Sequence, residues 1–91
     1  MEEELFEKIT FDLKQIQRNI TTDVSYSDLD AHNDLVKLLT EIGNLVEKND
    51  FEKLSKFYDL IRELVLFSPE SRQKLKINSA IGSFLSDLEK D

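Results

Sequence analysis

Apolar side chains recur at steps of three and four residues along most of this chain, and only two Gly and one Pro interrupt the pattern. An α-helix repeats about every 3.6 residues, so this spacing collects apolar side chains on one helix face. Strands would require apolar and polar residues to alternate over a run, and no such run of useful length is present. A chain of 91 residues fits one domain with one core. We therefore expect a single all-α domain spanning residues 1–91.

The first two apolar stripes predict one helix over about residues 3–20 and a second that follows a linker of residues 21–28 and ends at about residue 48. The connection between them is rich in Thr, Ser and Asp, whose side chains hydrogen-bond to nearby backbone in turns. Ser27 followed by Asp30 is typical of a capping box at the start of a helix. His32 is expected at the edge of the core, because it lies one helical turn before Leu35.

The other two stripes predict helices over about residues 51–67 and 69–89. The last turn of the first of these is apolar all round, so we expect it to be the most buried part of the protein. Ser68 and Pro69 are typical of a helix start. Asn78 could mark a break in the last helix, but one continuous helix is favoured.

Four amphipathic helices with short connections form either a bundle or a stack of helical hairpins. The segment 50–88 also resembles one helical repeat of the HEAT type. A second copy at a fixed period is missing, so a solenoid is not expected.

Negative charge dominates the first third of the chain. Residues 1–36 carry nine acidic and three basic side chains, and no Lys or Arg lies between Asn19 and Val36. Such a surface repels nucleic acid and anionic lipid and favours encounter with basic partners. No apolar stretch approaches the roughly 20 residues that a membrane span needs. With an acidic start and no Cys, the sequence predicts a cytoplasmic protein that binds neither nucleic acid nor membrane.

The residues favour binding over catalysis. The chain has one His and no Cys, and it lacks a glycine-rich phosphate loop, so we expect no enzyme activity and no cofactor. Four side chains that can ligate metals alternate at the start of the second helix: Asp28, Asp30, His32 and Asp34. A calcium loop of this pattern also requires Gly and Glu, where this chain has Asn33 and Leu39. We therefore expect no metal site, with Asp28 and Asp30 stabilising a helix start instead.

An acidic surface with interspersed aromatic side chains is typical of a face that binds a basic protein. Phe11 falls outside the apolar stripe of its helix, so it is either an exposed anchor or packed under the connection that follows. The candidate partner-binding residues are Phe11, Asp23, Tyr26, Asp28, Asp30 and Asp34. The same charges would also serve solubility alone, and the sequence leaves both readings open.

The run from Asn49 to Leu88 carries a family resemblance. Its elements are Phe57-Tyr58, a Ser-Pro-Glu break and Ile77-Asn78-Ser79-Ala80. This segment resembles small helical bacterial immunity proteins, inhibitors that neutralise a cognate toxin. The resemblance implies a basic, toxin-like protein partner for the acidic face. It carries over no functional residue, because the binding face in those proteins varies with the toxin.

A structural or adaptor subunit is the alternative function. The wide apolar stripes and the apolar end of the third helix could remain partly uncovered in a four-helix domain. Such a surface would support a homodimer or a larger assembly.

Overall fold

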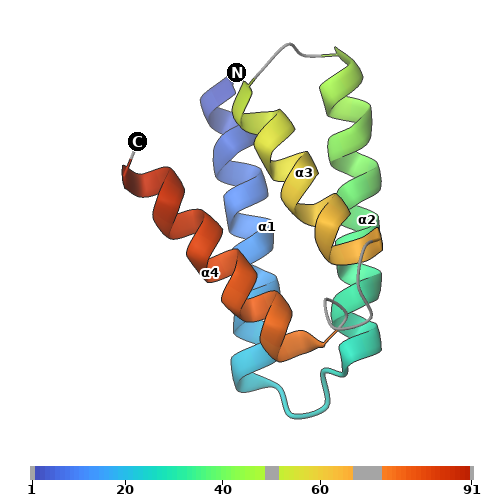
Figure 1. Ribbon diagram of the computed structural model, residues 1–91. Helices are drawn as coiled ribbons and strands as arrows, with labels where there is room; N and C mark the ends of the chain where they lie inside the picture. Colours follow the sequence, from blue (N-terminus) through green and yellow to red (C-terminus); the bar gives the residue numbers. More distant parts are fainter. Residues whose placement is uncertain (1, 49–51, 67–72, 91) are drawn as a thin grey trace.

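The computed structural model describes residues 2–48, 52–66 and 73–90. It contains four helices: α1 (Glu2–Thr22), α2 (Asp28–Lys48), α3 (Glu52–Leu66) and α4 (Lys74–Lys90). They pack together as a bundle, and no strand occurs within these ranges (Figure 1). The predicted all-α fold is confirmed. None of the described helices combines the length and apolarity that crossing a membrane requires.

The helices pair as α2 with α3 and as α1 with α4 (Figure 1). The backbones of α3 and α4 approach one another least of all the helix pairs. The HEAT-like pairing expected in the second half of the chain is loose, because α3 and α4 meet through the rings of Phe57 and Phe84 while their backbones share few contacts. The start of α4 is held by a hydrogen bond, in which the Lys74 backbone N–H donates to the Asp28 carboxylate at the start of α2. From that point α4 runs along α1.

One apolar cluster drawn from all four helices forms the core. Its centre is Phe57, which is fully buried and makes edge-to-face contacts with Phe6 and Phe84 at ring-centroid distances of 5.7 and 5.1 Å. Phe57 thus joins three helices, because Phe6 belongs to α1 and Phe84 to α4. Aromatic pairs in this geometry stabilise by about 0.5–1.5 kcal/mol beyond their buried area.

The end of α3 is not the most buried part of the protein. Its earlier turns hold three fully buried side chains, Leu54, Phe57 and Ile61, whereas Leu66 is 58% exposed. Only one side of the last turn faces other helices, so its apolar residues divide between core and surface. Phe67, which shared the prediction, lies outside the described residues.

Local hydrogen bonds set the helix starts. The Ser27 N–H donates to the Asp30 carboxylate and the Asp30 N–H donates to the Ser27 hydroxyl, so the predicted capping box is confirmed. Helix α4 begins at Lys74 after a bend at Gln73, later than the predicted start, and it continues through Asn78 without a break. Ser68 and Pro69, the predicted start signals, lie outside the described residues.

Candidate partner-binding groove

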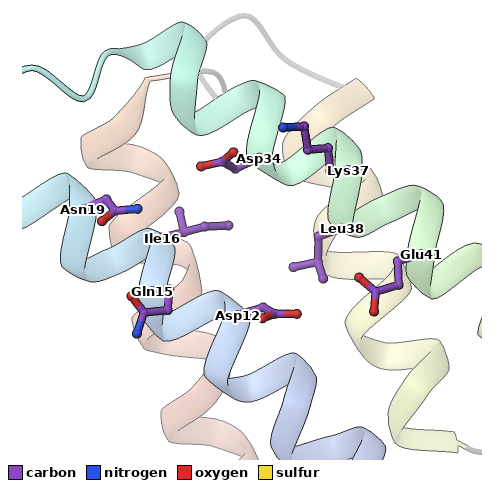
Figure 2. Close-up of a pocket in the computed structure, with 8 residues that line it drawn as sticks. All are labelled: Asp12, Gln15, Ile16, Asn19, Asp34, Lys37, Leu38 and Glu41. Carbon is purple, nitrogen blue, oxygen red and sulfur yellow. The ribbon is translucent and has the colours of Figure 1, made fainter.

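A groove of about 230 Å³ runs between α1 and α2 (Figure 2). Ile16 of α1 and Leu38 of α2 are buried and point into the space between the two helices, where they form its apolar floor. The polar side chains that line it are Asp12, Gln15, Asn19, Asp34, Lys37 and Glu41. The groove therefore combines an apolar floor with walls that carry charge, which is the usual make-up of a recognition site.

The groove is electronegative because three carboxylates and one ammonium group line it. Lys8, just beyond the lining, forms an ion pair with Glu41, and this hydrogen bond raises the pKa of Lys8. Partial burial raises the pKa of Asp12, and the nearby negative charge of Glu41 raises it further, more than Lys8 lowers it. Ionised Asp12 is thus in an unfavourable environment, which a cation placed in the groove would improve.

Replacing Asp12 with Asn should stabilise the protein near neutral pH. The pKa of Asp12 is raised above its ordinary value of 3.8. The stabilisation from its protonated form is complete below that value and is lost as the pH rises through the folded-state pKa. The amide of the Asp12→Asn variant cannot ionise, so the melting temperature should rise at about pH 7 and remain unchanged below about pH 3.8.

Asp59→Asn is the matched control for this comparison, because Asp59 is exposed on α3 and its loss changes the net charge equally. Equal effects of the two substitutions at about pH 7 would mean that general charge reduction, and not the groove, explains the gain.

The α1–α2 connection uses its acidic side chains to fix its own backbone. The Ser25 N–H and hydroxyl both donate to Asp23 Oδ1, at 3.0 and 2.6 Å. These two hydrogen bonds lower the pKa of Asp23. The predicted partner-binding residue Asp23 is exposed, yet its carboxylate already orders the turn.

Tyr26 lies in the core and not on the surface. Its side chain is only 7% exposed, and its hydroxyl donates to Asp34 Oδ2 at 2.7 Å. Burial raises the pKa of Tyr26, and the hydrogen bond to Asp34 raises it further. The prediction of Tyr26 as an anchor for a partner is corrected on this ground, because a buried ring cannot enter another protein. Its function is to hold the connection against α2.

Asp28 stabilises α4 as well as the helix on which it lies. Its Oδ1 accepts the Lys74 backbone N–H at 2.9 Å, and Lys74 Nζ donates to the Tyr26 carbonyl oxygen at 2.8 Å. The expected role of Asp28 and Asp30 at a helix start is confirmed, and for Asp28 it extends to a second helix. Both residues remain exposed at the end of the bundle.

Phe11 is exposed, with 59% of its surface accessible. The sequence left open whether Phe11 is exposed or packed under the following connection, and its exposure is confirmed. It lies four residues before Gln15, a groove residue, and the two side chains are neighbours on the surface of α1. Phe11 therefore lies beside the groove, on the outer surface of α1.

Of the predicted residues, only Asp34 lines the groove, and sequence reasoning missed the other polar lining residues. On α1, Asp12, Gln15 and Asn19 follow the three- and four-residue spacing of a helix face beside the apolar stripe. This polar row was the available signal. These side chains form one wall of the groove only because α1 packs against α2, and no local sequence pattern specifies that packing.

Metal-ligating side chains do not converge in the part of the chain that the structure describes, where no group of three could hold an ion. His32 is half-buried as expected, and its Nδ1 is buried without a hydrogen-bond partner among the described residues.

The groove can thus offer carboxylates to a cation and an apolar floor to a side chain. Comparisons with protein families, with curated proteins and with solved structures found no significant match.

Proposed function

We propose that this domain is a non-catalytic binding protein that takes up a basic, amphipathic segment of a partner protein in the α1–α2 groove. The observation that carries the proposal is the grouping of Asp12, Asp34 and Glu41 around the apolar floor of one groove. An inhibitor of the immunity type, with a basic toxin-like partner, is the class that we propose.

The electrostatic state of the free protein favours such a partner. Partial burial and then the neighbouring charge of Glu41 raise the pKa of Asp12, so its ionised form is destabilised. A Lys or Arg of the partner in the groove would remove this unfavourable interaction, so binding gains energy that the isolated domain lacks. The exposed acids of the connection and of the first turn of α2, Asp23, Asp28 and Asp30, would extend the negative field and accelerate encounter.

Phe11 would supply the apolar contact on the rim. Aromatic side chains are enriched at protein interfaces and contribute a large share of binding energy when a partner covers them. Because Phe11 lies beside the acidic groove, one partner segment could contact its ring and the groove carboxylates together.

Capture of partners from a lysate of the source organism tests this proposal. We expect the immobilised domain to retain one basic protein, and we expect Phe11→Ala and Asp12→Lys each to weaken its binding about tenfold or more. Both changes alter exposed or half-exposed side chains, so the fold should persist.

The matched controls are Leu75→Ala on α4 and Asp59→Lys on α3, which alter an exposed apolar and an exposed acidic residue away from the groove. Retention of the same protein by all four variants would contradict the proposal, and so would failure of the wild-type domain to retain any basic protein.

Self-association is the second candidate. Leu29 and Val36 are exposed seven residues apart on the outer face of α2, and Leu66 is exposed at the end of α3. A second copy of the chain could cover these side chains. A concentration series in the analytical ultracentrifuge separates the two candidates, because a strict monomer removes this one and leaves the groove proposal intact.

A further inference from the structure

A second cleft, of about 350 Å³, lies among α1, α3 and α4 near the start of α1 and the end of α4. Figure 1 shows α4 inclining away from α1 toward its C-terminal end. The walls are apolar: Phe6 from α1, with Leu85 and Leu88 from α4. Its volume falls within the range of roughly 300–1,000 Å³ typical of small-molecule sites.

The charge of this cleft is opposite to that of the chain. The protein carries a net charge of −7, yet among the described residues that line the cleft the two charged side chains are both lysines, Lys14 and Lys53. Lys53 Nζ lies 4.8 Å from the centroid of the Phe6 ring, so a cation–π contact holds one ammonium group over an apolar wall. Lys14 makes no ion pair with any residue that the structure describes.

Thr10 adds an unsatisfied polar group. It lines the cleft between Phe6 and Lys14 on α1, and its hydroxyl is buried with no hydrogen-bond partner among residues 2–48, 52–66 and 73–90. A buried polar atom without a partner is destabilising, and rotation of the side chain would let the hydroxyl donate to an acceptor in the cleft.

We propose that this cleft binds a single-chain carboxylate of medium length, of which octanoate is the simplest representative. The alkyl chain would lie against Phe6, Leu85 and Leu88, and the carboxylate would lie between Lys14 and Lys53 at the mouth. Ammonium groups beside an apolar cleft select a negative head group joined to an apolar tail.

Titration of the ¹⁵N-labelled protein with octanoate, below its micellar concentration, tests the proposal. We expect saturable shifts of the backbone amide signals of Thr10, Lys14 and Leu88, together with a rise in melting temperature. Decanoate should bind more tightly by about fourfold per added methylene until the cleft is full. Octylammonium, with the same tail and the opposite charge, should not bind.

The double variant Lys14→Gln/Lys53→Gln should weaken octanoate binding about fivefold, because each exposed ion pair contributes a modest amount. The matched control is Lys56→Gln/Lys76→Gln, which removes two exposed lysines outside the cleft. Shifts spread over the whole surface, equal binding of octylammonium, or equal weakening in both double variants would overturn the proposal. Melting curves without ligand verify that each variant is folded.

Discussion

Truncation of Phe57 to Ala should reduce the free energy of unfolding by about 3–5 kcal/mol, the cost typical of removing a buried aromatic ring. Phe57 is fully buried and packs edge to face against Phe6 and Phe84, so the cavity would open where three helices meet. Small domains are stable by only about 5–15 kcal/mol in total, and the variant should therefore be close to unfolding at 25 °C. Urea denaturation followed by circular dichroism measures the loss.

Phe11→Ala is the control for this substitution, because the same ring is removed from a site that is 59% exposed. Its cost should stay within about 0.5 kcal/mol, as for most surface changes. Similar losses in the two variants would contradict the assignment of Phe57 to the centre of the core.

Truncation of Tyr26 to Ala should cost about 3 kcal/mol, the second largest effect that we expect. The substitution removes a ring that is only 7% exposed and also the hydrogen bond from its hydroxyl to Asp34. It also loosens the segment whose carbonyl oxygen accepts from Lys74, so α4 should lose part of its attachment. Urea denaturation gives the total loss, and amide hydrogen exchange should show the largest loss of protection at the start of α4.

Tyr26→Phe separates the ring from the hydroxyl. It keeps the buried ring and should cost about 1.5 kcal/mol, the value for one hydrogen bond to a charged group at the lower end of its range. A Tyr26→Ala variant as stable as the wild-type protein would contradict the burial of Tyr26 and favour the surface position that the sequence predicted.

The helices were predictable because their signals are local. The apolar spacing and the pairing of Ser27 with Asp30 predicted the end of α2 as the structure has it and its start within one residue, and both ends of α1 within two residues. The pairing of α4 with α1 was not predictable in this way. Part of the attachment of α4 is a hydrogen bond between Asp28 and Lys74, which lie 46 residues apart, and nothing in the pattern of α4 specifies that partner.

The candidate groove was predictable only in part. The acidic character of the first third of the chain indicated a basic partner, and Asp34 does line the groove. Its other carboxylates, Asp12 and Glu41, come together through the rotation of α1 and α2 about their axes, which core packing decides. Tyr26 was predicted wrongly, because a tyrosine among aspartates is typical of a surface. Its ring instead lies in the core, and its hydroxyl contacts the carboxylate of Asp34.

The most direct test of the central claim is a map of backbone amide shifts in the ¹⁵N-labelled domain on addition of the basic protein that it captures. We expect shifts concentrated on the groove-lining residues of α1 and α2, between Asp12 and Asn19 and between Asp34 and Glu41, and on Phe11 beside them. We also expect added salt to weaken the binding of the basic protein steeply. Shifts confined to α3 and α4, or binding that does not change with salt concentration, would contradict binding in the groove.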